Sequence, residues 1–398
     1  MRRKLLAHAS FFVMLLSSGA IYVSNLFLAS ALSLNDYGYY ALLVTFLSVA
    51  SSYGLGGFDQ AIVRTAREVD GCLEVNPILF FLSIFSSFVF GALAFFYFDS
   101  LADGSGVFAA ISGFFVSIGL FGYAVGRVRK LFVFAQFSHG GYRIAFAICL
   151  LVAWVADAEL NAKVIDDLFI MSSGVVALFV VVFLLYRVST SLVGASGESV
   201  LGFAVGYGMS MLLMNIIGYG DRVLIERFFG LESAAAYFFY ANIYIFPFSL
   251  LQAYVGFKEL ARYKESFSLG VFHGDLFRAL KVFCSVLVLC VLVDFLLTKY
   301  FFVGVFDFGV ADRVLLIALG GMRIVYGLLS AALGARALPA AIHQVNGITV
   351  LAVLSIGGAF LFVDDKTLVL LILCFLAAWI ARAMSVYYLV CKQDYRGR

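Results

Sequence analysis

Long apolar stretches alternate with short polar ones along the whole chain. Unbroken runs such as ILFFLSIFSSFVFGALAFFYF from Ile78 are about 20 residues long, the length of a helix that spans a bilayer. They lack the period-2 alternation of membrane-barrel strands, so helices are indicated. The expected spans lie at about 9–31, 37–57, 78–98, 106–126, 142–157, 167–186, 199–229, 233–255, 279–299, 310–334, 343–363 and 367–391.

Two of these predictions depend on local features. The fifth span is short for a bilayer, because its apolar core runs only from Ile144 to Ala156. Pro247 falls inside the eighth span and should bend it, either as a hinge or as a fixed kink. Among the connections, the longest run from Phe58 to Pro77, from Arg127 to Tyr142 and from Phe257 to Arg278, and each is expected to form an interfacial helix or a basic loop.

The second half of the chain repeats the feature order of the first half. A shift of 197 residues aligns Tyr219 with Tyr22, Leu231 with Leu34, Tyr237 with Tyr40 and Arg222 with Asn25. We therefore expect two six-helix lobes, 1–196 and 197–398, joined by the Gly- and Ser-rich stretch from Ser191. With six helices per repeat both lobes keep one orientation, which predicts a pseudo-two-fold axis along the membrane normal.

Composition supports an all-α integral membrane protein. Mean hydropathy is +1.04, and only 13% of the residues are charged, where a soluble domain has roughly a quarter. Twelve spans leave no room for a soluble catalytic domain, so we do not expect an enzyme. The net charge of +3 fits a membrane-side bias and does not indicate a nucleic-acid partner.

Basic residues predict the orientation of the chain. With the N-terminus inside, 19 of the 27 Lys and Arg residues lie in cytoplasmic segments, against six outside, which puts both termini in the cytoplasm. The basic start of the chain resembles a cleavable signal peptide, but it heads the first repeat, and we expect it to be retained.

Motifs for metal or nucleotide chemistry are missing from the sequence. The six cysteines show no CxxC spacing, and the four histidines have no partner at ligand spacing. Gly54, Gly56 and Gly57 follow no strand and precede no GK[ST], so a nucleotide loop is not indicated. We expect no cofactor and no metal.

Charged residues inside expected helices are the remaining candidates for function. Asp221, Arg222 and Glu226 lie near the outer end of the seventh helix. Arg222 and Glu226 can pair at i,i+4, whereas Asp221 points about 100° away and needs a partner on another helix. In the alternative, the helix ends at Gly220 and these charges lie in external water.

Two further arginines fall inside apolar helices. Arg323 lies in the middle of LLIALGGMRIVYGLLSAAL without a carboxylate in that helix, and its helical face continues through Tyr326. Its alternative role is structural, with the guanidinium bonded to backbone carbonyls. Arg382 lies nearer the cytoplasmic end of the last helix, where a snorkelling side chain is the alternative.

Several segments resemble one transporter family. The segment LNDYGYYALLVTFLSVASSYGLGGFDQAIVR from Leu34 to Arg64 resembles the second helix and first cytoplasmic loop of polysaccharide flippases. The pairs Asp221-Arg222, Gly230-Leu231 and Ala236-Tyr237 resemble their seventh and eighth helices. The family is the Wzx-like branch of the multidrug, oligosaccharidyl-lipid and polysaccharide exporter superfamily.

This resemblance implies a V-shaped pair of lobes around a central cavity in the bacterial inner membrane. The implied activity is alternating-access transport of an undecaprenyl-pyrophosphate-linked oligosaccharide, an O-antigen or exopolysaccharide repeat unit, from the inner to the outer leaflet. The resemblance leaves the coupling cation open between H⁺ and Na⁺. Besides membrane lipids, it admits a polysaccharide polymerase or chain-length regulator as a partner.

The substrate-binding residues are expected to follow from the substrate's chemistry. Buried guanidinium groups bind diphosphate oxygens with bidentate geometry, while amides and aromatic rings bind sugars. The residues expected at the site are Arg222 and Arg323 for the diphosphate, Asn25, Asn215, Tyr22, Tyr219 and Tyr326 for the sugars, and Asp221, Glu226 and Arg382 as further candidates.

Three alternative functions remain open. A multidrug cation antiporter would share the fold, but its cavity should hold acids with few bases. A membrane polysaccharide polymerase or ligase would need a sizeable external loop with catalytic residues, and the sequence shows none. A structural partner in an envelope complex would leave the intramembrane arginines unexplained.

Overall fold

The structure, a computed structural model, is almost entirely helical. It describes residues 2–69, 72–102, 104–190, 197–306, 308–336 and 339–396. The first seven helices are α1 (Arg2–Ala31), α2 (Leu34–Tyr53), α3 (Phe58–Thr65), α4 (Pro77–Asp99), α5 (Ser105–Val128), α6 (Phe132–Val155) and α7 (Ala162–Arg187). The others are α8 (Gly197–Tyr244), α9 (Phe246–Glu265), α10 (Leu269–Tyr300), α11 (Val310–Arg336), α12 (Pro339–Leu361) and α13 (Leu368–Arg396). The three short strands are β1 (Arg67–Val69), β2 (Cys72–Val75) and β3 (Val188–Thr190).

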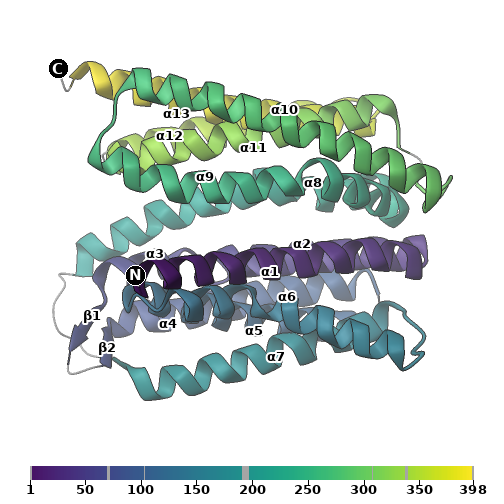
Figure 1. Cartoon of the computed structure of the whole chain (residues 1–398), viewed down its shortest axis with the longest axis horizontal. Coiled ribbons are helices and arrows are strands. Elements are labelled where there is room, and N and C mark those ends of the chain that lie inside the picture. Colours follow the sequence, from purple (N-terminus) through teal and green to yellow (C-terminus); the bar gives the residue numbers. More distant parts are fainter. Residues whose placement is uncertain are drawn as a thin grey trace. The chain divides into compact units, whose positions relative to one another are not determined.

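The chain divides into two compact units, Met1–Asn215 and Ile216–Arg398. Within each unit the long helices run side by side (Figure 1). The division falls within α8. The predicted linker covers residues 191–199, of which 191–196 lie outside the part of the chain that the structure describes and 197–199 form the start of α8. The predicted lobe boundary at residue 196 stays a prediction.

Small residues hold the first unit together where α1, α5 and α6 pack. A Cβ atom added at Gly140 on α6 would lie 2.6 Å from Oγ of Ser17, and one at Gly119 on α5 would lie 2.4 Å from the carbonyl oxygen of Ser138. The small residues of α6 therefore face other helices. They also explain why the fifth span was predicted too short, since α6 begins at Phe132, ten residues before the expected start at residue 142.

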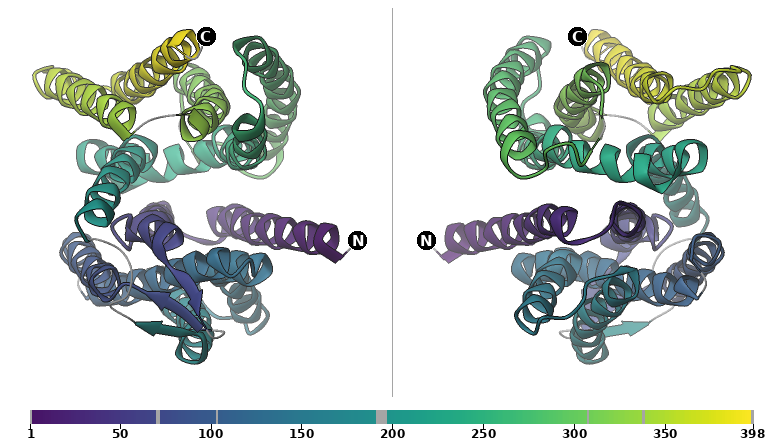
Figure 2. Two further views of the ribbon diagram at one scale, coloured as in Figure 1. Left: turned by 90° about the vertical axis from the view of Figure 1, so that its left-hand side faces the viewer. Right: turned by 90° about the vertical axis from the view of Figure 1, so that its right-hand side faces the viewer.

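A small sheet replaces much of the expected interfacial helix between Phe58 and Pro77. Only the short α3 forms there, and β1 and β2 follow as an antiparallel hairpin, with β3 parallel to β2. The strands lie together at one end of the helices of this unit (Figure 2). Every second residue of β2 is buried: Leu73 and Val75 belong to the same apolar core as Ile62 of α3. This period-2 pattern is what favours a strand over a helix.

Two backbone breaks interrupt the helices between residues 197 and 265. At Gly230, φ is 86° and ψ is 174°, a conformation that is essentially restricted to glycine and that divides α8 in two. At Ile245 the axis bends by 47° before α9, which has Pro247 in its first turn. The bend predicted at Pro247 is confirmed, and the hydroxyl of Ser249 donates to the Ile245 carbonyl at 3.1 Å.

The protein is an all-α, multi-pass membrane protein. By length and apolar composition, ten helices of the described chain can cross a membrane, and the bent pair of α8 and α9 adds an eleventh span when counted as one. Gly230 divides that pair into two long helical segments. This break falls between the spans expected at 199–229 and 233–255.

In the second unit, α11 packs against α9, α10 and α13, and α13 packs against α12. An ionic cluster fixes the corner between α9 and α10. Arg262 pairs with Asp275 and, at 2.8 Å, with Glu259. Burial raises the pKa of the Tyr263 hydroxyl to about 12, so it stays a donor to Asp275, at 2.9 Å, near neutral pH. The connection expected from Phe257 to Arg278 is therefore mostly helix with a short corner.

Candidate functional site

Arg323 is buried in the middle of α11 and contacts two other helices. Its Nη2 donates to the carbonyl oxygen of Gly218 on α8 at 2.7 Å. Its Cζ lies over the indole ring of Trp379 on α13, 4.8 Å from the ring centroid. Among the described residues its buried Nε has no hydrogen-bond partner. The backbone contact expected for a structural arginine is thus present, but it leaves part of the guanidinium unsatisfied.

Asp221 is buried on α8 next to the arginines. Its Oδ2 accepts a hydrogen bond from the hydroxyl of Tyr237, and its Oδ1 accepts one from the backbone N–H of Arg222 at 2.9 Å. Tyr237 lies beyond the break at Gly230, on the next helical segment. The partner that Asp221 requires therefore comes from another helix, as expected. The alternative in which the helix ends at Gly220 is wrong, because α8 continues past it.

Arg222 lies between aromatic rings. Its Cζ is 5.4 Å from the ring centroid of Tyr219 and 5.7 Å from that of Phe238. Its Nε is buried and, like that of Arg323, has no hydrogen-bond partner within the described residues. Glu226 lies one turn further along α8 and is half-buried. These two cation–π contacts stabilise the guanidinium without using its N–H donors.

These groups form one electrostatic cluster within the second unit. Asp221, Arg222 and Tyr237 all interact electrostatically with Arg323. The cluster thus combines two guanidinium groups with the buried carboxylate of Asp221. An ion removed from water needs charge partners and hydrogen bonds, and an unpaired buried donor costs about 1–3 kcal/mol. The arrangement favours an anion with several acceptor oxygens as a ligand.

A second buried arginine, Arg382, is linked to Arg323 through the side chains of Tyr326 and Trp379. Nε of Arg382 on α13 donates to the Tyr326 hydroxyl oxygen at 2.9 Å, and its Nη1 donates to Oγ1 of Thr349 on α12 at 3.0 Å. With 1% of its surface exposed, Arg382 does not snorkel. The rings of Tyr326 and Trp379 meet edge to face with centroids 5.2 Å apart. Arg323 and Arg382 therefore lie at the two ends of one stack of side chains.

Three expected site residues lie in the first unit. Asn25 is buried on α1 and accepts a hydrogen bond from the Tyr40 hydroxyl on α2 at 2.6 Å, while Tyr22 on α1 is half-buried. The amide of Asn215 accepts from Ser52 at 2.8 Å and donates to the Met211 carbonyl oxygen at 2.8 Å. The second unit holds the other seven, namely Tyr219, Asp221, Arg222, Glu226, Arg323, Tyr326 and Arg382.

One hydrogen bond recurs in both units. Tyr40 donates to Asn25, and Tyr237, its counterpart under the shift of 197 residues, donates to Asp221. Asp221 is one residue before the counterpart of Asn25. Both tyrosines lie on the segment that follows the polar helix. The repeat in sequence therefore corresponds to a repeated side-chain contact, with a carboxylate replacing an amide in the second copy.

The chain resembles known proteins in fold and not in sequence. No family model and no curated protein matches the chain. Several solved structures have the same fold, and three of them are the following. The lipid II flippase MurJ, in an inward closed conformation, has a TM-score of 0.60 at 14% identity, over 97% of this chain and 87% of that one. The MATE multidrug transporter DinF-BH has a TM-score of 0.58 at 15% identity, over 99% of this chain and 95% of that one.

A third structure is an inward-facing multidrug resistance MATE transporter of the MOP superfamily. Its TM-score is 0.56 at 16% identity, over 96% of this chain and 94% of that one. The chain has the fold of these transporters. The likeness covers 96–99% of this chain and 87–95% of the three solved structures. The expected fold is confirmed, while membership of the superfamily and of its Wzx-like branch stays a proposal.

The sequence did not single out several contacts of the site. Tyr237, Trp379 and Thr349 each touch a predicted residue but carry no charge. One signal was present for Trp379, which is three residues before Arg382 on α13 and therefore shares its helical face. Tyr237 was visible through the repeat with Tyr40 and through the Ala236-Tyr237 pair of the resemblance, but neither predicted its contact with Asp221. In the described residues, no group of three or more His, Cys, Asp or Glu side chains could hold a metal ion.

Proposed function

We propose that the protein is a flippase that moves an undecaprenyl-pyrophosphate-linked oligosaccharide from the inner to the outer leaflet of a bacterial inner membrane by alternating access. The observation that carries this proposal is the pair of arginines, Arg222 and Arg323, around the single buried carboxylate of Asp221. Each arginine has a buried Nε without a hydrogen-bond partner in the described chain. The oxygens of a diphosphate would satisfy both groups.

The other residues have separate roles in the proposal. Arg323 presents a planar, multiply donating group on a fixed helix, which suits bidentate binding of phosphate oxygens. Tyr219 and Tyr326 offer rings and hydroxyls for the first sugars. In the first unit, the sequence predicts Tyr22, Asn25 and Asn215 as further sugar-binding residues. Arg382, held by Tyr326 and Thr349, positions the Tyr326 ring.

A multidrug cation antiporter is the competing function, because the fold is shared with MATE multidrug transporters. A cationic drug would be repelled by Arg222 and Arg323. Of these three residues, only Asp221 would attract it. The excess of guanidinium groups therefore supports an anionic substrate. The likeness to the lipid II flippase MurJ shows that the same fold serves a lipid-linked substrate.

A deletion strain separates the two functions. Loss of the protein should cause lipid-linked oligosaccharide to accumulate on the cytoplasmic leaflet, and a plasmid copy should restore export. The readout is the fraction of this lipid that is accessible in inverted vesicles compared with right-side-out vesicles. Sensitivity to cationic dyes without any accumulation of the lipid would favour the antiporter instead.

A further inference from the structure

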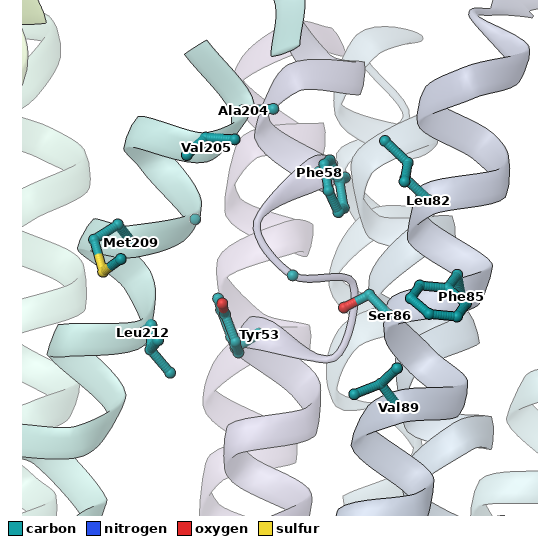
Figure 3. A pocket seen from close by; sticks show the side chains of 12 residues that line it. Tyr53, Phe58, Leu82, Phe85, Ser86, Val89, Ala204, Val205, Met209 and Leu212 are labelled. Carbon is teal, nitrogen blue, oxygen red and sulfur yellow. The ribbon is translucent and has the colours of Figure 1, made fainter. Parts of the chain in front are cut away.

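A second candidate site lies in the first unit and shares no residue with the cluster of Asp221, Arg222 and Arg323. It is a pocket of about 400 Å³ between the end of α2, the start of α3, α4 and the first part of α8. Ligand pockets usually have volumes of about 300–1,000 Å³. Its lining is mostly apolar and includes Phe58, Leu82, Phe85, Val205, Met209 and Leu212 (Figure 3).

The rim of the pocket is apolar and exposed. Phe85 on α4 and Val205 on α8 are 66% and 57% exposed, and Met209 is also exposed. Phe85 belongs to a row of exposed apolar residues on α4 that includes Phe81 and Phe88. In a membrane-spanning helix such a row faces hydrocarbon. The pocket therefore opens where lipid chains lie.

Close backbone packing shapes the inner wall of the pocket. The turn before α3 contains Gly56 and Gly57 with φ of 63° and 83°. A Cβ atom added at Gly57 would lie 2.5 Å from Cα of Gly208, and one added at Gly208 would lie 2.6 Å from the carbonyl oxygen of Gly56. Glycine at these positions lets α8 approach the turn, and the side chains of Tyr53 and Ser86 lie beside it (Figure 3).

A cation lies beside the pocket. Arg64 is exposed at the end of α3, six residues after Phe58, which is about 9 Å along a helix axis. Its Cζ lies 5.4 Å from the ring centroid of Tyr207, the residue before Gly208, and its Nη2 is 3.5 Å from the Tyr207 hydroxyl. An apolar pocket with a guanidinium and a hydroxyl beside it matches a lipid chain attached to an anionic headgroup.

We propose that this pocket binds one acyl chain of an anionic phospholipid of the membrane, whose phosphate lies at Arg64 and Tyr207. The site is separate from the arginine cluster and does not depend on the proposed transport substrate. Its cation favours phosphatidylglycerol over phosphatidylcholine with the same chains.

Lipid binding to the full-length purified protein tests this proposal. Native mass spectrometry would titrate phosphatidylglycerol, phosphatidylcholine and undecaprenyl phosphate against wild-type protein, Arg64→Gln and Val205→Trp. Arg64→Gln should weaken phosphatidylglycerol binding about fivefold, the contribution of one cation near a membrane surface. Val205→Trp should remove binding by filling the pocket. Met209→Trp, one helical turn away, fills it from a second position if Val205→Trp misfolds.

Two matched variants serve as controls. Lys130→Gln removes an exposed cation outside the pocket, and Leu93→Trp adds an indole at an exposed α4 position that does not line it. Both should bind phosphatidylglycerol as the wild type does. Equal binding by wild type and the pocket-filling variants, or equal affinity for both phospholipids, would overturn the proposal. Tighter retention of undecaprenyl phosphate than of phosphatidylglycerol would also overturn it.

Discussion

At the scale of single residues, the structure explains how charged side chains exist inside an apolar helix bundle. An arginine at the centre of a spanning helix costs about 2.5–3.5 kcal/mol on insertion scales. Arg323 offsets part of that cost with a carbonyl oxygen and an indole ring, and Arg382 does so with two hydroxyl oxygens. The buried Nε of Arg323 has no hydrogen-bond partner in the described chain, and an acceptor oxygen of the proposed ligand would supply one.

The repeated tyrosine contact gives a prediction about stability. Tyr237→Phe removes a hydrogen bond to the carboxylate of Asp221, whereas Tyr40→Phe removes one to the neutral amide of Asn25. Hydrogen bonds to charged groups contribute about 1.5–3 kcal/mol and neutral ones about 0.5–1.5 kcal/mol. Thermal unfolding in detergent should therefore show a larger loss for Tyr237→Phe. Equal losses would contradict the expected difference between the two hydrogen bonds.

At the scale of helices, glycine determines where α8 divides. Gly230 adopts a backbone conformation that other residues reach only at a cost of about 1–3 kcal/mol. Because the chain turns at Gly230, the Tyr237 hydroxyl can donate to the Asp221 carboxylate, 16 residues earlier in the sequence. Without this break α8 would continue as one rod and carry Tyr237 away from its partner.

Two glycine substitutions test this view of α8. Gly230→Ala should lower the thermal stability, because alanine is strained at φ of 86°. Gly220→Ala is the matched control, since its Cβ would have its nearest neighbour at 3.7 Å, an ordinary contact, and should be neutral or stabilising by about 0.5–1 kcal/mol. A Gly230→Ala protein as stable as the control would contradict the assignment of a fixed break.

Element prediction succeeded where one physical rule dominated and failed where packing decided. Apolar run length placed the spans, and Pro247 marked the bend before α9. The start of α6 was missed because residues 127–142 were assigned to an interfacial helix or a basic loop. Ser138 and Gly140 in this stretch are instead small residues at helix contacts of the span itself. The strands were missed because β2 is only four residues long, and its partner β3 is distant in sequence.

Site prediction had a similar limit. Arg222, Asp221 and Arg323 could be chosen from sequence because charge is rare in apolar segments. Their partners could not, because Gly218 contributes only a backbone carbonyl and Trp379 looks like an ordinary core residue. Such contacts depend on how α8, α11 and α13 pack, which the pattern of each helix alone does not contain.

At the scale of the whole molecule, the distribution of basic residues makes a topology prediction. Nineteen of 27 lie in segments expected in the cytoplasm, which places both termini there. A reporter that is active only outside the cytoplasm should be silent when fused after Arg398 and active when inserted at Asp364. Activity at Arg398 would contradict the combination of a cytoplasmic N-terminus with an even number of spans.

The central claim is that this transporter fold moves a lipid diphosphate through contacts with Arg323. The most direct measurement is flipping of a fluorescent undecaprenyl-pyrophosphate oligosaccharide by purified protein in proteoliposomes, followed by reduction of the externally exposed label. Wild-type protein and Arg227→Ala, which removes an exposed cation of α8, should flip the lipid at equal rates. Arg323→Lys should be slower because it loses the planar fork, and Arg323→Ala should be inactive at equal reconstitution. Flipping by Arg323→Ala at the wild-type rate would contradict the account.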